Sequence, residues 1–141
     1  MIIDATDLMV GRLSSFAAKK ALLGEKVDIV NCEKAVVSGK KQEIVAKYFR
    51  KYQMGVPKKG PFLHRRADRL LRRTIRGMLP YKQPKGVEAY KRVMCYNAVP
   101  NELEGKKADT LKSANYSKLP NLKYLKLGDV SKLIGGKDQD S

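Results

Sequence analysis

The chain has 141 residues, of which 43% are hydrophobic and 31% are charged, and its formal net charge is +16. This length suits one domain with a core of its own, and the apolar content excludes a wholly disordered chain. The sequence shows no apolar run of membrane-spanning length and no charged-then-apolar leader. We therefore expect neither a membrane protein nor a secreted one.

Most of the charge lies in one segment. Residues 47–92 hold 15 Lys and Arg against two acids, Asp68 and Glu88, whereas residues 1–46 and 93–141 are nearly neutral. Like charges at this density repel one another and destabilise a compact fold unless a partner neutralises them. A nucleic-acid backbone is the commonest partner of this kind.

The cysteines and the histidine argue against a disulfide and a metal site. Cys32 and Cys95 each lie in an apolar, strand-like run, which favours two reduced core thiols in a cytoplasmic protein. With His64 as the one histidine, the usual ligand set of a zinc site is missing. We expect no metal and no cofactor.

The first third of the chain predicts a β-α-β unit. Residues 2–5 form a short apolar strand, and a helix is expected from an N-cap at Thr6 or Asp7 to a stop at Gly24. Residues 27–30 follow as a second strand. A helix between two strands normally makes a right-handed crossover, so these strands should be parallel.

A third strand and a second helix follow. Residues 35–37 are the strand, and residues 41–54 are the helix, which should end at Gly55. The helix is expected to turn five side chains inward, namely Ile44, Val45, Tyr48, Phe49 and Tyr52.

The most informative element is the helix expected over residues 65–78, after a Gly- and Pro-rich loop at 55–61. At about 100° per residue, its six arginines fall within an arc of roughly 120°. The opposite side is apolar, and Asp68 is the one acid that relieves the repulsion. Arginine grips phosphate oxygens bidentately and stacks on bases, which favours nucleic acid. The arginine stripe comprises Arg65, Arg66, Arg69, Arg72, Arg73 and Arg76, and the apolar stripe comprises Ala67, Leu70, Leu71, Ile75 and Met78.

Two other interpretations of this helix remain open. A basic helix face is often only a solvated face, although six arginines beside a Lys-Gly-Pro loop favour nucleic acid. A cationic amphipathic helix also binds anionic membranes, but the Trp and Phe anchors of such helices are missing from its apolar side. Membrane binding therefore ranks third.

The rest of the chain is less regular. After a stop at 77–80 we expect a basic loop over 81–86, a short helix over 86–92 and a last strand over 93–96. Residues 101–141 are predicted to form a Lys-rich arm with brief ordered pieces, including a turn capped by Asp129, and a frayed end from Gly135.

Catalytic motifs are incomplete. Ser38-Gly39-Lys40-Lys41 resembles the end of a phosphate-binding loop but lacks the upstream glycine and the Ser or Thr after the lysine. The alternative to a binding protein is a small α/β enzyme acting on nucleotides or RNA. It would need a pocket at the carboxyl ends of the strands, near Thr6, Asp7 and Ser38. We expect no enzyme.

Several motifs together resemble the large-subunit ribosomal protein thirteen family over nearly the full chain. They are Ile3-Asp4-Ala5, Gly11-Arg12-Leu13, Val30-Asn31-Cys32-Glu33-Lys34-Ala35, Ser38-Gly39 and, above all, Arg76-Gly77-Met78-Leu79-Pro80. The stretches His64-Arg65-Arg66-Ala67 and Pro84-Lys85-Gly86 resemble the archaeal and eukaryotic branch, and the short chain implies an archaeal-type member.

The resemblance implies a three-layer α/β/α sandwich around a four-stranded, mostly parallel sheet. It implies a core domain over 1–100 and a C-terminal arm over 101–141, packed on the core or on RNA. The implied function is that of a structural constituent of the large ribosomal subunit in the cytoplasm, which binds large-subunit rRNA and supports assembly. Partners would be this RNA and neighbouring large-subunit proteins, with no membrane, no small-molecule substrate and a monomer outside the ribosome. A free RNA-binding regulator could have the same sequence features, and only the family resemblance favours a ribosomal protein over it.

The proposed mechanism is electrostatic clamping by a rigid array of cations. The arginine stripe supplies its centre, and loops and the preceding helix supply its flanks. Besides the six arginines, the expected RNA-binding residues are Lys58, Lys59, His64, Lys82, Lys85, Lys47, Arg50 and Lys51.

Overall fold

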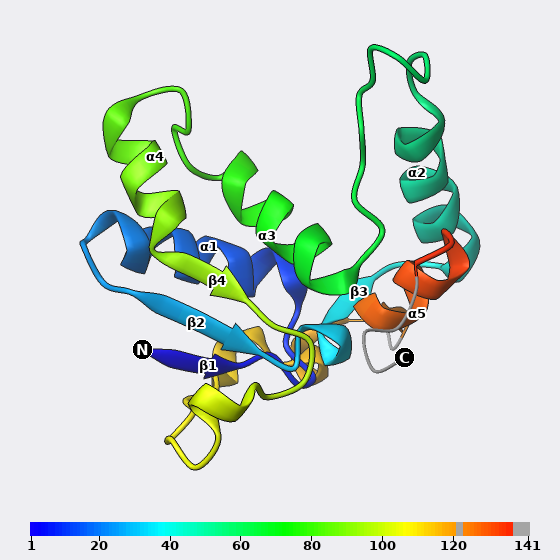
Figure 1. Ribbon diagram of the computed structural model, residues 1–141. Coiled ribbons are helices and arrows are strands. Elements are labelled where there is room, and N and C mark those ends of the chain that lie inside the picture. Colours follow the sequence, from blue (N-terminus) through cyan, green and yellow to red (C-terminus); the bar gives the residue numbers. More distant parts are fainter. Residues whose placement is uncertain (121–122, 137–141) are drawn as a thin grey trace.

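The computed structural model describes residues 1–120 and 123–136 (Figure 1). Over these residues it is an α/β protein, and none of its helices is long and apolar enough to cross a membrane. The strands are β1 (Ile2–Asp4), β2 (Val27–Val30), β3 (Val36–Ser38), β4 (Val93–Cys95) and β5 (Tyr124–Lys126). The helices are α1 (Val10–Leu22), α2 (Lys41–Gln53), α3 (Ala67–Gly77), α4 (Pro84–Lys91) and α5 (Leu127–Leu133), with short 3-10 turns η1 (Cys32–Lys34), η2 (Asn101–Leu103), η3 (Lys112–Ala114) and η4 (Tyr116–Lys118).

The central sheet is parallel, with the strand order β1-β2-β4. Ile3, Ile29 and Cys95 stand side by side across it, which places all three on one face. The predicted parallel β1-α1-β2 unit is confirmed. Both crossovers step in the same direction across the sheet, so right-handed connections put their helices on the same face. Accordingly α1 contacts both α3 and α4, and all three contact β4.

The expected four-stranded sheet is wrong. After β2, Asn31 adopts a left-handed conformation (φ 56°) and η1 turns the chain away from the sheet. The third predicted strand, β3, pairs instead with β5 in a separate antiparallel ribbon. A partner this distant in sequence could not be foreseen from the local pattern around residues 35–37.

The expected three-layer α/β/α arrangement is also wrong, because α1, α3 and α4 gather on one face of the sheet (Figure 1). The chain after β4 instead runs along the free edge of β1. There the Asp4 amide donates to the Asp109 carbonyl at 2.9 Å, and the Asp109 amide donates to the Ile2 carbonyl at 2.8 Å.

The helix α3 is held by its apolar stripe. Leu70, Leu71 and Ile75 are buried in a core that also contains Leu13 of α1 and Val93 of β4. Burying one such side chain contributes about 2 kcal/mol. The prediction that Met78 belongs to this stripe is wrong, because α3 ends at Gly77 and Met78 is 43% exposed.

The helix α2 covers less of the core than predicted. It has the expected bounds within a residue, but Ile44 is its one buried residue and Phe49 is 42% exposed. It packs mainly against α5 and β5 rather than the parallel sheet. Together with residues 54–63, α2 stands apart from α3 and α4 as a separate lobe (Figure 1). Of the five side chains predicted to point inward, Ile44 is buried and Tyr48 packs half-buried against the core, so the prediction is confirmed only for this part of the helix.

The predicted N-cap of the first helix is wrong. Helix α1 begins at Val10, and Asp7 lies in the left-handed region (φ 61°). Thr6 instead closes a turn on Asp4, because its amide and its hydroxyl donate to Asp4 Oδ1 at 3.0 and 2.7 Å. Asn31 Nδ2 donates to the same oxygen at 3.1 Å, so this carboxylate ties the end of β1 to the end of β2.

The predicted short helix starts two residues early, at Pro84, because proline suits the first turn of a helix. Gly86 is required there, since a Cβ at this position would collide with the Pro80 carbonyl. Close contact between α4 and the turn after α3 therefore depends on this glycine.

The two cysteines are buried and free, as predicted. Burial raises the pKa of the Cys32 thiol, and the neighbouring Cys95 raises it further. Both thiols therefore behave as core side chains.

The C-terminal region contains more regular structure than the predicted brief pieces, because β5 is followed directly by α5. Leu127, Val130 and Ile134 are buried, so this helix contributes to the core. Asp129 lies in the first turn of α5 rather than at its N-cap. The expected frayed end from Gly135 lies mostly outside the described residues.

Replacing Asp4 by alanine should lower the free energy of unfolding by about 1–2 kcal/mol, because three donors lose their acceptor. Burial alone would raise the pKa of Asp4, but the hydrogen bonds from Thr6 and Asn31 and the charge of Lys34 lower it below 3.8. The stabilisation should therefore be complete above pH 4–5 and disappear as the pH falls through the lowered pKa. Urea unfolding at several pH values measures both effects.

The matched control is Asp109→Ala, which removes the same charge from an exposed side chain. It should leave the free energy of unfolding within about 0.5 kcal/mol of the wild type. Equal losses in the two variants would contradict the assigned role of the Asp4 carboxylate.

Candidate nucleic-acid interface

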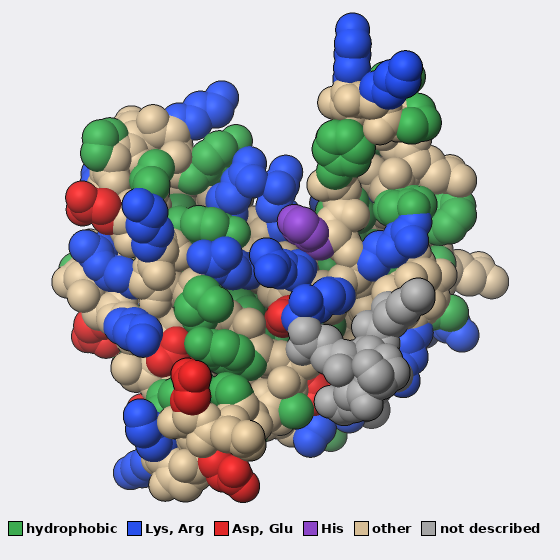
Figure 2. All heavy atoms as spheres, in the orientation of Figure 1, with side chains coloured by type: hydrophobic (Ala, Val, Ile, Leu, Met, Phe, Trp, Pro, Cys, Tyr) green, Lys and Arg blue, Asp and Glu red, His purple; other side chains and the backbone are tan. Residues whose placement is uncertain are grey.

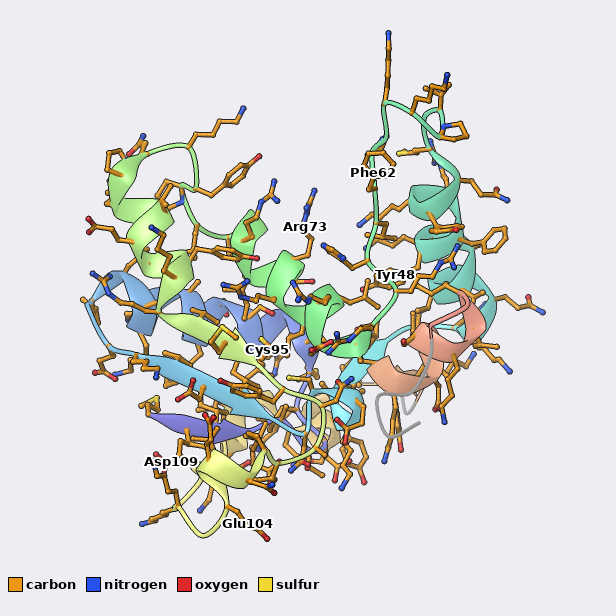
Figure 3. All side chains as sticks on the ribbon, viewed as in Figure 1. Tyr48, Phe62, Arg73, Cys95, Glu104 and Asp109 are labelled. Atoms are coloured by element: carbon orange, nitrogen blue, oxygen red, sulfur yellow. The ribbon has the colours of Figure 1, made fainter. Side chains whose placement is uncertain are left out.

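The cationic side chains are unevenly distributed over the face drawn in Figure 2. Figure 2 shows most Lys and Arg side chains of this view over α3, α4 and the α2 lobe, while the Asp and Glu side chains lie mainly in the lower half. Asp109 and Glu104 mark that lower end (Figure 3). The apolar stripe of α3 causes this separation, because burying it on α1 and the sheet turns the opposite, arginine-rich side outward.

Two of the six predicted arginines do not lie in the helix. Helix α3 begins at Ala67, so Arg65 precedes it and Arg66 is its N-cap residue. Asp68 in the first turn explains this start. Its Oδ1 accepts from the Arg69 amide at 2.9 Å, and a carboxylate there is stabilised by the helix dipole.

Three of the arginines are held by tyrosine rings. The guanidinium carbons of Arg65, Arg72 and Arg76 lie 3.9, 4.1 and 4.3 Å from the ring centres of Tyr52, Tyr90 and Tyr81. Such stacking is attractive because the ring face is electronegative, and it leaves guanidinium N–H groups free to donate. The hydrogen bond and the charge of Arg76 in turn lower the pKa of Tyr81.

Arg72 is the most firmly fixed of these. Its Nε donates to the Val93 carbonyl at 3.0 Å, and its Nη2 donates to the Tyr90 carbonyl at 3.4 Å. Arg72 therefore joins α3 to the end of α4 and the start of β4. Its role is partly structural, which the regular spacing of the stripe does not reveal.

Carboxylates neutralise little of this surface. Among the described residues, Arg66 is the one member of the stripe in an ion pair, at 2.9 Å from Asp68. Arg69 and Arg73 are exposed on α3. The charge of the stripe is thus largely available to a partner.

The other eight predicted residues are all exposed, but they are spread over four parts of the chain. Lys47, Arg50 and Lys51 lie on α2, and Lys58, Lys59 and His64 lie in the segment between α2 and α3. Lys82 lies in the turn after α3, whereas Lys85, predicted in a loop, lies in the first turn of α4.

A cleft of about 420 Å³ brings residues of α2 and α3 together. Lys47 and Lys51 line it from α2, and Arg73 lines it from α3. Lys58 and Lys59 do not line this cleft. A second hollow of about 340 Å³ is lined by Arg66, Arg69 and Arg72, beside the end of β4.

Sequence reasoning missed the tyrosines that hold the arginines. The signal was present, since Tyr52, Tyr81 and Tyr90 all lie within the basic segment. It also left out Lys91, which is exposed, and Arg92, whose Nη1 donates to the Ala21 carbonyl at 2.9 Å. The contact with Ala21 joins residues 71 positions apart, so no local pattern could indicate it.

The pocket expected of an enzyme does not bring Thr6, Asp7 and Ser38 together, because Ser38 lines the cleft of about 420 Å³ and the other two do not. The Asp4 carboxylate is occupied by Thr6 and Asn31, and Asp7 turns the backbone toward α1. The described residues contain no group of three or more metal-ligating side chains.

The fold and this surface define a small α/β protein with one strongly basic face. Residues 1–102 match the family model described as ribosomal protein L13. The large ribosomal subunit protein uL13 of Methanopyrus kandleri is 42% identical over 136 residues, covering 95% of this chain and 86% of the relative. The protein of the same name from Methanococcoides burtonii is 43% identical over 136 residues, covering 96% of this chain and 98% of the relative. The chain belongs to the ribosomal protein L13 family, and these relatives are archaeal, as the sequence motifs implied.

The adjacent residues Arg72 and Arg73 provide a matched pair of substitutions. Arg72→Ala should lower the free energy of unfolding by about 2–3 kcal/mol, because two carbonyl contacts and a ring contact are lost. Arg73→Ala should change it by no more than about 0.5 kcal/mol, since its side chain is exposed. Urea unfolding of both variants tests this, and similar losses in the two would show that Arg72 is not a tether.

Proposed function

We propose that the protein is a structural constituent of the large ribosomal subunit, not an enzyme, and that it binds large-subunit rRNA through its basic face. Membership of the L13 family supports the place in the subunit. The observation that supports RNA binding is the arginine stripe, in which Arg69 and Arg73 are exposed and Arg66 is the one member in an ion pair among the described residues. The protein acts in the cytoplasm, as part of the subunit.

The proposed mechanism is attachment by a preorganised array of cations. Burial of Leu70, Leu71 and Ile75 fixes α3, so its arginines need little further ordering when RNA binds. Tyr52, Tyr81 and Tyr90 restrict three of the guanidinium groups in the same way. RNA helices expose phosphates and 2′-hydroxyls more readily than base edges, so this contact recognises mainly shape.

The fourteen predicted residues divide into roles under this proposal. Arg69, Arg73 and Arg76 of α3 contact phosphates from the centre of the face, with Arg65 and Arg66 at the start of the helix. Arg72 contributes charge while it fixes the helix. RNA on either side of α3 is contacted by the predicted residues of α2, of the segment before α3 and of the 82–85 region. By holding separate RNA segments, this array supports subunit assembly.

The remaining surface is proposed to face neighbouring large-subunit proteins and solvent. Outside the ribosome we propose a monomer, because the repulsion between two basic faces opposes their association. A free RNA-binding regulator is the second candidate. The two differ in whether the protein stays bound to large subunits when ionic strength is high.

A co-sedimentation experiment separates these two functions. Tagged protein expressed in cells should sediment with large subunits and stay with them after a wash in high salt, because rRNA and protein neighbours both enclose it. Complete release into the supernatant would contradict the structural role and favour the free regulator.

The basic face itself is tested by a pair of double substitutions. Arg69→Gln with Arg73→Gln removes two exposed charges from α3 without touching the tethers. When the logarithm of the binding constant for large-subunit rRNA is plotted against the logarithm of salt concentration, the slope should become less steep by about one to two units. Filter binding at several salt concentrations measures this slope.

The matched control is Lys106→Gln with Lys107→Gln, which removes two exposed charges between Glu104 and Asp109, at the opposite end of the molecule. It should leave the slope nearly unchanged. If both pairs flattened the slope equally, the contact would depend on net charge, and the proposed face would be wrong.

A further inference from the structure

The cleft between α2 and α3 has an apolar floor and a cationic mouth. Val36 of β3 and Leu70 of α3 are buried at its floor, with Leu63 half-buried beside them. Lys47, Lys51 and Arg73 line the same cleft and are exposed. The polarity therefore changes from apolar to positive between the floor and the opening.

The cleft has the dimensions and the polar groups of a small-molecule site. Its volume of about 420 Å³ lies within the range of about 300–1,000 Å³ that is usual for ligand pockets. Ser38 and Thr74 bring hydroxyl groups to its wall. Since the Thr74 hydroxyl donates to the Leu70 carbonyl at 3.0 Å, its oxygen can still accept a hydrogen bond.

Aromatic and cationic side chains face each other across this space. Figure 3 shows Tyr48 on α2 and Arg73 on α3 at the two sides of the gap. Burial raises the pKa of Tyr48 above its ordinary value, and a tyrosine hydroxyl can both donate and accept hydrogen bonds. The Nζ of Lys51 lies 5.7 Å from the centre of the Tyr48 ring, which keeps this cation at the mouth.

We propose that this cleft binds one unstacked nucleotide of the RNA. The base enters beside Tyr48 and above the apolar floor, with its polar edge toward Ser38 and Thr74. The flanking phosphates lie at Lys47, Lys51 and Arg73. This proposal rests on the proposed RNA-binding function and adds to it, since the rest of the face recognises paired RNA by its backbone.

The charge of the lining favours a nucleotide over a protein segment. Apart from Tyr48, the ionisable side chains that line the cleft are Lys47, Lys51 and Arg73, which are all cations. No carboxylate of the described residues lines it. An unpaired nucleotide supplies a flat apolar ring and two flanking phosphates, which match the floor and the mouth respectively. Single-stranded loops and bulges present bases in this unstacked form.

Two glycines allow the cleft to be filled without changing any charge. Gly11 of α1 and Gly77 of α3 both line it, and a Cβ built at either would meet no other atom within 4 Å. Since Gly11 lines the cleft, Gly11→Leu should extend a side chain into it without a clash at the Cβ. Since leucine favours helices more than glycine does, the melting temperature should not fall.

The experiment uses the full chain and two RNA hairpins that differ only by a bulge of three unpaired nucleotides. The wild type should bind the bulged hairpin about tenfold more tightly than the fully paired one, in keeping with the usual strength of base–aromatic stacking. Gly11→Leu should abolish this preference while leaving affinity for the paired hairpin and the salt slope unchanged. Gly77→Leu, which adds the same side chain to the cleft lining from α3, should do the same.

Two controls isolate the effect of filling. Gly11→Ala removes the glycine but leaves most of the space, and Ala46→Leu adds the same side chain to an exposed position of α2 outside the cleft. Both should keep the preference for the bulge. Equal affinity of the wild type for the two hairpins, or an intact preference in both filled variants, would overturn the nucleotide site.

The outcome is distinguishable from failure of the proposed function. If the wild type bound neither hairpin nor large-subunit rRNA, RNA binding itself would be wrong. If it bound both hairpins and rRNA with the expected salt dependence but ignored the bulge, only the nucleotide site would fail. A neighbouring protein segment would then be the occupant to seek.

Discussion

The burial of one side of α3 is the constraint on which the rest of the structure depends. Leu70, Leu71 and Ile75 pack against α1 and β4, and this packing leaves the helix no freedom to rotate about its axis. Because the arginines occupy the opposite side, they are forced outward and close together. Each like-charged pair at this spacing costs a few tenths of a kcal/mol, which the apolar contacts outweigh several times over.

The chain also limits the freedom of its arginines with its own aromatic rings. Tyr52 lies in α2, Tyr81 in the turn after α3 and Tyr90 in α4, yet each lies against a guanidinium group. A carboxylate in the same place would hold the arginine but would also neutralise it. A tyrosine ring orders the side chain and leaves the positive charge available to a phosphate. The contrast with Arg66, which pairs with Asp68, shows both solutions within one short segment.

Local patterns predicted most of the regular elements but not their assembly. The residues that form β1, α1, β2, α2, α3 and β4 were all recognisable, because each has the apolar period of its element. The pairing of β3 with β5 depends on residues nearly ninety positions apart, so no window of sequence contains it. The placing of α1, α3 and α4 on one face of the sheet likewise follows from strand order, which the sequence does not display.

The candidate site was predictable to a similar degree. Net charge and arginine spacing identified the basic segment, since both are properties of neighbouring residues. They could not separate Arg72, which donates to two backbone carbonyls, from Arg73, which is exposed. The cleft was also invisible in the sequence, because its walls come from α1, β3, α2 and α3. Its mouth and its floor exist only when these elements are brought together.

The separation of basic and acidic side chains between the two ends of the molecule gives the protein an electric dipole moment. In the field of a polyanion, such a body experiences a torque as well as an attraction. Rotation during approach would then turn α3 toward a polyanionic partner before any contact is made, and a larger fraction of collisions would become productive. Reversing the acidic end, far from every predicted contact, would therefore slow association while leaving dissociation almost untouched.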